Sequence, residues 1–229
     1  MRRTLLLALG ATLSIAPPQA LRARRAVQSL VDQGKLDDAE RIARAAGDRL
    51  AGTLGEVLVV RGRLQSADSV FRSAIAAGSP ERRIAEVSLA ELAARHGDFG
   101  DSFRRADAIA AAFERSTTPW SSDDRTAAGR AYLLLGGERR WVQSALAAFD
   151  GAVVADSSNI DAMVRIGDLF MDKFNAPDAT AAYDVVLRRA PTNPRGLLGL
   201  ARVLDFQNSS EAAAALQRAV AANRALIVS

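Results

Sequence analysis

Apolar residues recur at helical spacing through residues 160–193, with one short interruption. In the first half they stand three or four residues apart, at Met163, Ile166, Phe170 and Phe174. That spacing places them on one face of a helix. The pattern stops at residues 175–177 and resumes through residues 179–187. Pro191 then ends it, because proline cannot continue a helix. The segment therefore predicts two antiparallel helices joined by a tight turn.

The second of these helices has counterparts upstream and downstream at a fixed interval. Ala145, Ala179 and Ala213 follow one another at steps of 34 residues. The residues four positions after these alanines are Phe149, Tyr183 and Gln217. The residues seven positions after them are Ala152, Val186 and Val220. A fixed period of this length is the signature of stacked helical hairpins. The sequence therefore predicts an all-α repeat array.

On these residues the chain resembles the tetratricopeptide repeat (TPR) family. That family has small residues at positions 8, 20 and 27 of its repeat, large apolar residues at 7, 11 and 24, and often proline at 32. Counted from Ile160 as position 1, the matching residues are Ile166, Gly167, Phe170, Ala179, Tyr183 and Pro191. Two departures are Val186 at position 27 and the missing glycine in the turn. The resemblance implies a right-handed α–α superhelix.

Small residues explain how two such helices pack. Helices approach closely only where neither carries a bulky side chain, and larger residues then interdigitate around that point. Gly167 and Ala179 are the small residues of this unit. We therefore expect the two helices to cross most closely there.

Turns carry the repeat signal in the first half of the chain. Gly34, Gly62 and Gly97 each lie two residues before an apolar residue, and glycine adopts the left-handed turn conformation without a Cβ clash. An insertion of four residues lies around residues 136–140, and the loop at 116–122 is a candidate kink or sub-array boundary. Within a solenoid over residues 21–229, the predicted helical pairs are 21–47, 48–80, 81–117, 122–157, 160–191 and 194–223.

Residues 1–20 have the three-part pattern of a secretory signal peptide. Arg2 and Arg3 form a basic start, residues 4–16 are uncharged and mostly apolar, and two prolines follow. The apolar run is short for a bilayer span, which takes about 20 residues. A buried first helix or a retained anchor is the alternative, and the cleavage position stays open. The pattern predicts export to the bacterial periplasm or cell envelope, with no stable membrane span after signal removal.

Composition narrows the chemistry further. The chain of 229 residues has a formal charge of +4, and without residues 1–20 it has 28 basic and 26 acidic residues. Both signs are interspersed, with no basic stripe of the kind that binds nucleic acid. The sequence has no cysteine, which excludes disulfides, thiolate catalysis and zinc sites built on sulfur.

No residue stands out as catalytic, and no metal site or cofactor is predicted. His96 is the one histidine and sits in a turn, and one histidine without cysteine cannot build a typical zinc site. The acidic pairs at residues 37–38 and 123–124 resemble helix-start residues that cap free N–H groups. Trp141 is expected in the core, whereas Trp120, in a loop, is a candidate surface contact.

The resemblance implies that the first helix of each pair lines a concave groove. In the fourth to sixth units the matching positions hold Arg130, Asp161, Val164, Asp168, Met171, Arg195, Leu198, Arg202 and Phe206. The lysine and asparagine with which some members of the family grip a C-terminal carboxylate are absent from these positions. Arg130 and Arg202 are candidate carboxylate ligands, with pairing to neighbouring acids as the alternative.

The final residues raise the question of what covers the end of the array. Leu226, Ile227 and Val228 look like the start of a further helix, without the polar cap that such arrays normally carry. Either the chain continues in a longer protein, or this end packs against a partner or a second copy.

The leading hypothesis is a non-catalytic protein–protein interaction scaffold of the cell envelope that binds a peptide or protein in its groove. The alternative is a non-catalytic N-terminal repeat region of a longer exported enzyme, such as a protease or hydrolase.

Overall fold

The computed structural model describes residues 19–223, and within that range the chain is all-α with no strand. The predicted signal peptide lies outside the described residues, except for Gln19 and Ala20, which open the first helix. The apolar end at residues 226–228 also lies outside them.

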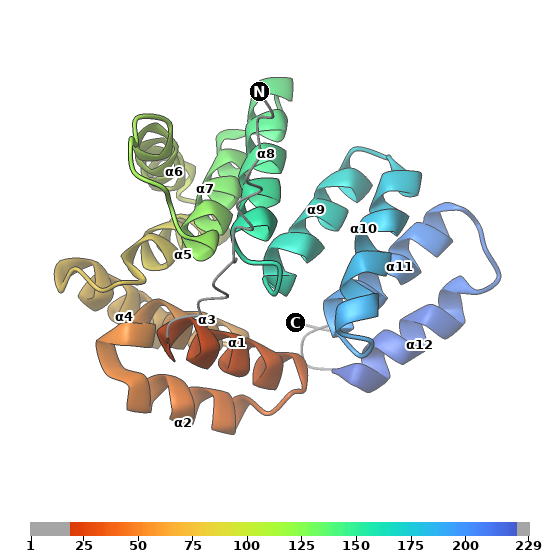
Figure 1. Cartoon of the computed structure of the whole chain (residues 1–229), viewed down its shortest axis with the longest axis horizontal. Helices are drawn as coiled ribbons and strands as arrows, with labels where there is room; N and C mark the ends of the chain where they lie inside the picture. The colour runs from red at the N-terminus through yellow and green to blue at the C-terminus, as the bar shows by residue number, and fades with distance from the viewer. Residues whose placement is uncertain (1–18, 224–229) are drawn as a thin grey trace, which may run out of the picture.

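Helices in the described part of the chain follow one another as six hairpins (Figure 1). The first helices are α1 (Gln19–Asp32), α3 (Ala51–Val60), α5 (Arg82–Arg95), α7 (Ser122–Leu135), α9 (Ile160–Asp172) and α11 (Pro194–Phe206). The second helices are α2 (Leu36–Ala46), α4 (Leu64–Ala76), α6 (Phe99–Glu114), α8 (Arg139–Ala155), α10 (Ala176–Arg189) and α12 (Ala212–Ala222). A 3-10 helix, η1 (Gly47–Leu50), precedes α3. Each predicted pair corresponds to one of these hairpins.

The turn inside a hairpin has a recurring backbone geometry. Gly34, Gly62 and Gly97 have φ angles of 72°, 71° and 83°, each two residues before the second helix begins. Phe174 holds the same place before α10 and has a φ of 57°. A Cβ is disfavoured in this left-handed region. The fifth hairpin therefore keeps the turn geometry without glycine, at the cost of a strained phenylalanine.

Asparagines cap the helices of the later hairpins. Asn159 accepts a hydrogen bond from the Ala162 N–H at the start of α9, and Asn193 accepts one from the Gly196 N–H at the start of α11. Such caps satisfy N–H groups that have no partner inside the helix. The Asn159 Nδ2 also donates to Ser122 Oγ at 2.9 Å. The cap of α9 therefore also ties that helix to α7.

Tyr183 shows how successive hairpins stack. Its ring is fully buried between α9 and α11. A Cβ on Gly167 would lie 2.6 Å from the ring, and a Cβ on Gly199 would overlap it. The Tyr183 hydroxyl donates to Asp168 Oδ1 at 2.7 Å. Gly167 and Gly199 therefore leave the space that the Tyr183 ring fills. The closest crossing of the two helices at Gly167 and Ala179 stays a prediction.

Trp120 lies in the core, so the candidate surface contact is wrong. The side chain is 6 % exposed and packs edge-on against Phe113, with the ring centroids 4.9 Å apart. The Arg83 guanidinium covers the ring at 4.0 Å from its centroid. Trp141 packs against the same cluster and is partly buried. The loop before α7 therefore contributes to the core because its aromatic side chain turns inward.

The hairpins curve into an arc whose two ends meet (Figure 1). Asn223, which follows α12, donates its Nδ2 to the carbonyl oxygens of Val31 and Asp32 at 2.8 and 3.2 Å. Those two residues end α1. The first hairpin therefore closes the concave side of the array, an arrangement that the repeat pattern did not predict.

Candidate functional site

A cavity of about 220 Å³ occupies the concave side. Its lining comes from the first helix of every hairpin, together with the cap residue of α11. The apolar part of the lining is aliphatic: Val27, Val31, Val57, Val59, Val60, Leu92, Ile160 and Val164. The superhelix therefore directs all six first helices in the described chain at one open cavity.

Arg130 lies at the wall of this cavity and is 5 % exposed. Its guanidinium pairs with Glu91 at 2.6 Å and Glu56 at 2.7 Å, and it donates to Ser88 Oγ at 3.0 Å. Burial acts to raise the pKa of Glu91, but Arg130 outweighs it and holds that pKa below its ordinary value. Arg130 therefore ties α7 to α3 and α5, as the alternative of pairing with neighbouring acids predicted.

A second buried arginine joins α1 to its neighbours. Arg24 is 4 % exposed and pairs with Glu56 at 3.1 Å and Glu81 at 3.4 Å. Its Nε lies 3.3 Å from Asp123 Oδ1, without hydrogen-bond geometry. Because Glu56 also pairs with Arg130, the two arginines and their acids form one network, of which Glu56, Glu91 and Arg130 line the cavity.

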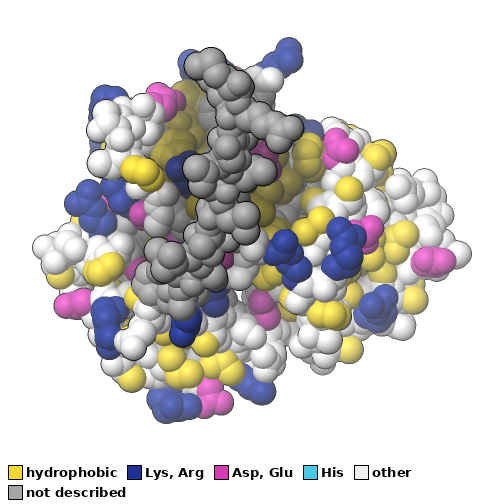
Figure 2. Space-filling model, viewed as in Figure 1, with side chains coloured by type: hydrophobic (Ala, Val, Ile, Leu, Met, Phe, Trp, Pro, Cys, Tyr) yellow, Lys and Arg dark blue, Asp and Glu magenta, His cyan; other side chains and the backbone are white. Residues whose placement is uncertain are grey.

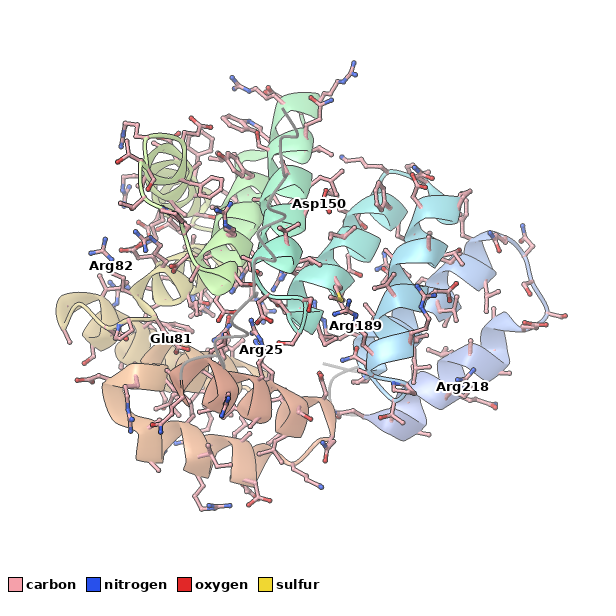
Figure 3. The ribbon with its side chains drawn as sticks, viewed as in Figure 1. Arg25, Glu81, Arg82, Asp150, Arg189 and Arg218 are labelled. Atoms are coloured by element: carbon pink, nitrogen blue, oxygen red, sulfur yellow. The ribbon has the colours of Figure 1, made fainter. Side chains whose placement is uncertain are left out.

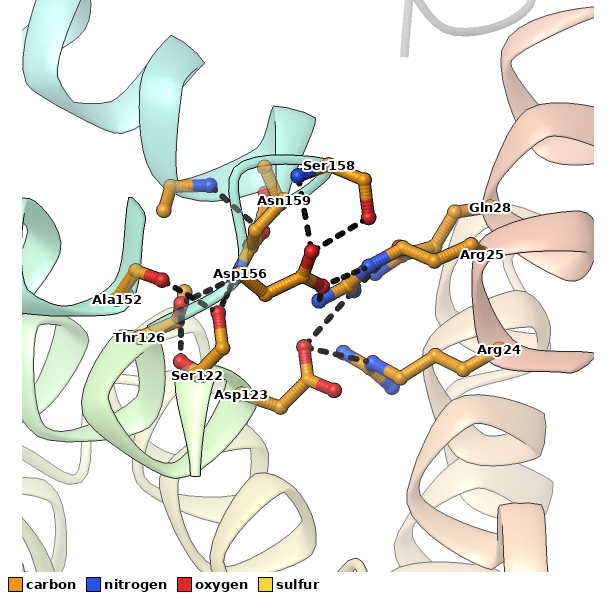
Figure 4. Close-up of polar contacts among 12 residues, drawn as sticks. Arg24, Arg25, Gln28, Ser122, Asp123, Thr126, Ala152, Asp156, Ser158 and Asn159 are labelled. Atoms are coloured by element: carbon orange, nitrogen blue, oxygen red, sulfur yellow. Dashed lines mark hydrogen bonds and ion pairs between the residues drawn. The ribbon is translucent and has the colours of Figure 1, made fainter. Parts of the chain in front are cut away.

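Arg25 makes the contact that holds α1 against the second half of the array (Figure 4). Its guanidinium pairs with Asp123 at 2.8 Å and with Asp156 at 2.9 Å, across 98 and 131 residues of sequence. Figure 3 shows Arg25 pointing into the centre of the arc. We call these ion pairs, together with the Asn193–Asp32 and Asn223–α1 hydrogen bonds, the seam.

Asp32 sits at the seam and lines the cavity. It accepts a hydrogen bond from Asn193 Nδ2 at 2.8 Å. Burial raises the pKa of Asp32 from 3.8 to about 6, against the opposing charge of Arg195. Asp32 is also the last residue of α1, where the helix dipole disfavours negative charge. Ionisation of this carboxyl group at the seam therefore destabilises the folded chain.

We call the charged side chains of the lining the cavity rim: Asp32, Glu56, Glu91, Arg95, Arg130, Asp161, Arg165 and Arg195. Within this rim, Asp161 has two arginine partners. It pairs with Arg195 at 2.6 Å and with Arg165 at 3.0 Å. Burial acts to raise its pKa, but these two arginines and Arg130 bring it well below its ordinary value. Asp161 therefore stays ionised and fixes the position of both rim arginines.

The structure divides the predicted groove residues into two sets. Arg130, Asp161, Val164 and Arg195 line the cavity, whereas Asp168, Met171, Leu198, Arg202 and Phe206 lie outside its lining. Met171 packs in the core beside Tyr183. Phe206 contacts the exposed Phe174, with the ring centroids 6.1 Å apart and the ring planes tilted by 35°. Arg202 lies 3.5 Å from Asp172.

Sequence reasoning missed the cavity residues of the first three hairpins and Arg165. The α1 side chains Val27 and Asp32 line the cavity only because the array closes. Arg165 lies outside the groove pattern of the resembled family. Arg95 lies within it, two residues before the left-handed Gly97 as Phe206 lies two before Asn208, and was missed because the pattern was applied only to the last three hairpins. The 34-residue period in the second half therefore located less than half of this site.

The described residues hold no candidate metal site and no candidate membrane span. Among residues 19–223, no group of three or more His, Cys, Asp or Glu side chains is placed to hold a metal ion. No helix in that range is long and apolar enough to cross a bilayer. Basic, acidic and apolar side chains are interspersed over the face seen in Figure 2. The arrangement is suited to binding by shape, apolar contact and hydrogen bonding.

Comparison with known proteins gives likeness in fold alone. No protein-family model matches the sequence, and no curated protein matches it. TTC0263, a thermophilic TPR protein in Thermus thermophilus, has a TM-score of 0.59 at 18% identity, covering 78% of this chain and 92% of that chain. The Cut9–Hcn1 hetero-tetramer of the APC/C gives 0.57 at 12% identity, covering 90% of this chain and 40% of that chain.

A third likeness is to a tetratricopeptide repeat protein from Parabacteroides merdae. It has a TM-score of 0.50 at 17% identity and covers 88% of this chain and 79% of that chain. The chain therefore has a TPR-like fold, an all-α superhelix of helical hairpins.

Proposed function

We propose that the chain is a non-catalytic protein-interaction scaffold that binds a segment of another protein in its concave cavity. The observation that carries the proposal is that all six first helices of the described chain contribute to one cavity, whose lining combines aliphatic and charged side chains. Ligand sites of proteins are typically concave and apolar, with a few placed polar groups. Repeat arrays of this kind present such concave surfaces to partners.

Site-specific photo-crosslinking tests this function directly. Val60 lines the cavity at the end of α3 and is partly exposed, so a photo-reactive residue there reaches an occupant. Val154 on α8 is 87 % exposed and does not line the cavity, which makes it the matched control. In cells that make the protein naturally, we expect a protein adduct from position 60 that position 154 does not give. The same adducts from both positions, or none from position 60, would reject the cavity as the binding site.

We also propose that the protein is exported. The basic start and the apolar run within residues 1–20 support this proposal. A fusion of residues 1–30 to a reporter enzyme that is active only outside the cytoplasm measures export. We expect activity from this fusion and none when Arg2 and Arg3 are replaced by Glu and two apolar leucines by Asp. Equal activity from both fusions would contradict the proposal.

A further inference from the structure

The acids of the cavity rim already have partners. Glu56 and Glu91 pair with Arg130, Asp161 pairs with Arg165 and Arg195, and Asp32 accepts from Asn193. A cation entering the cavity would have to compete with these contacts. The rim therefore has little unused capacity to accept hydrogen bonds from a ligand.

Two arginines on the rim do have unused donors. Arg165 donates from Nε to Asp161, and no hydrogen bond within residues 19–223 engages its two Nη groups. Arg95, the last residue of α5, is exposed and makes no hydrogen bond or ion pair in the described chain. Both line the cavity. A carboxylate matches such donors well, because guanidinium groups bind it by charge-assisted and often paired hydrogen bonds.

The apolar part of the cavity lining favours an occupant of a particular size and polarity. Its apolar lining contains valine, leucine and isoleucine and no aromatic side chain. A dry apolar cavity of about 150 Å³ accommodates a benzene-sized group, so a cavity of about 220 Å³ has room for a large aliphatic side chain. Burial of such a side chain is stabilising in proportion to the apolar area removed from water.

We propose that the occupant is a peptide segment in which an aliphatic residue stands next to an aspartate or glutamate. The aliphatic side chain enters the cavity, and the carboxylate binds Arg95 and Arg165. This inference rests on the proposed binding function and adds the chemistry of the partner. Asp161 holds the Arg165 Nε, and within residues 19–223 no hydrogen bond uses the two Nη groups, which remain as donors for the occupant.

Selection from a random dodecapeptide display library against the purified chain tests the inference. Enriched peptides are synthesised, and their affinities are measured by fluorescence polarisation. We expect an enriched motif with Leu, Ile, Val or Met beside Asp or Glu. Replacement of that acid by its amide is expected to weaken binding about tenfold or more, since hydrogen bonds between charged groups carry that much free energy.

Protein variants give the second arm of the experiment. Arg95→Gln with Arg165→Gln is expected to weaken the acidic peptides about tenfold and to leave their amide versions nearly unchanged. Arg82→Gln with Arg218→Gln removes the same charge from exposed arginines outside the cavity lining, and is expected to have no effect (Figure 3). Circular dichroism confirms that both double variants are folded.

The outcomes separate this inference from the proposed function. Peptides that lose binding when Val60→Trp fills the cavity, yet are indifferent to acid-to-amide replacement, would overturn the carboxylate inference and leave cavity binding intact. Enriched peptides that are unaffected by Val60→Trp, or the absence of any enriched peptide, would reject the proposed function and the inference together.

Discussion

At the scale of single residues, Tyr183 illustrates how the repeat is built. Its ring fills the space that two glycines leave, Gly167 within its own hairpin and Gly199 in the next. The hydroxyl reaches Asp168 and is therefore satisfied. One aromatic residue thus packs three helices together, because the backbone of α9 and α11 approaches the ring from both sides.

Gly199→Ala tests this packing. The added Cβ would overlap the Tyr183 ring, and overpacking costs about 1–3 kcal/mol, against about 1 kcal/mol gained in helix propensity. We expect a net loss of up to about 2 kcal/mol in the free energy of unfolding, measured by urea titration. Gly151→Ala is the control, because its new Cβ would meet the flexible end of Arg125. A stability equal to that of Gly151→Ala would contradict the packing role of Gly199.

Phe174 is the opposite case, a side chain where the backbone favours glycine. Phe174→Gly relieves a left-handed conformation that costs about 1–2 kcal/mol of stability. Glycine also lowers stability by about 0.5–1 kcal/mol, because it loses more conformational entropy on folding. We expect a gain of about 0.5–1 kcal/mol in the free energy of unfolding. Phe174→Ala removes the ring but keeps a Cβ at this position, so it should give no gain. A gain from alanine equal to that from glycine would show that the exposed ring, and not the backbone, is the source.

At the scale of elements, the helices were predictable and the seam was not. Apolar periodicity and the turn glycines gave every hairpin, because each depends on residues close together in sequence. Arg25 contacts Asp123 and Asp156 across 98 and 131 residues, and no local pattern signals such a contact. Trp120 was misplaced for the same reason, since its burial depends on packing between hairpins.

Asp32, at the end of α1, makes the folding stability of the chain depend on pH. A carboxyl whose pKa is raised to about 6 in the folded chain binds a proton there more readily than in the unfolded chain. Its contribution to stability is therefore fully present below pH 3.8 and is lost as the pH rises through about 6. Asp32→Asn cannot ionise but keeps an oxygen that accepts from Asn193.

We expect Asp32→Asn to be roughly 1–2 kcal/mol more stable than the natural chain at pH 7.5. Because protonation makes the two chains alike, that difference should shrink steadily from pH 6 to pH 4. Chemical denaturation at a series of pH values measures it. The difference between the two chains isolates Asp32 from the other carboxyls, and a difference that is constant with pH would contradict the assignment.

At the scale of the whole molecule, the seam decides the shape of the groove. Without it, α1 would be one end of an open superhelix, and the cavity would lack the wall that Val27, Val31 and Asp32 provide. The candidate site was predictable only in its smaller part for this reason. Residues from the strongly periodic hairpins, such as Asp161 and Arg195, follow from the repeat, whereas the α1 wall exists only in the closed arrangement.

X-ray scattering in solution tests the closure. We expect a radius of gyration near the roughly 17 Å of a compact chain of this length. Arg25→Gln with Asn193→Asp removes the central ion pairs and sets a carboxylate against Asp32, while aspartate still caps α11. This double variant should lose roughly 1–3 kcal/mol of stability and show a larger radius. Arg41→Gln with Asn175→Asp makes the same charge change away from the seam, and an equal radius for both would contradict closure by the seam.

The meeting of α1 with the far end of the array changes how the molecule comes apart. In an open row of hairpins, the outermost unit has one neighbour and frays first. Here α1 is joined to the sixth hairpin through Asn223 and through the Asn193–Asp32 hydrogen bond, and to the fourth through Arg25. Amide protons in α1 should therefore exchange with solvent as slowly as those of the interior helices. We expect the array to unfold in a single cooperative transition.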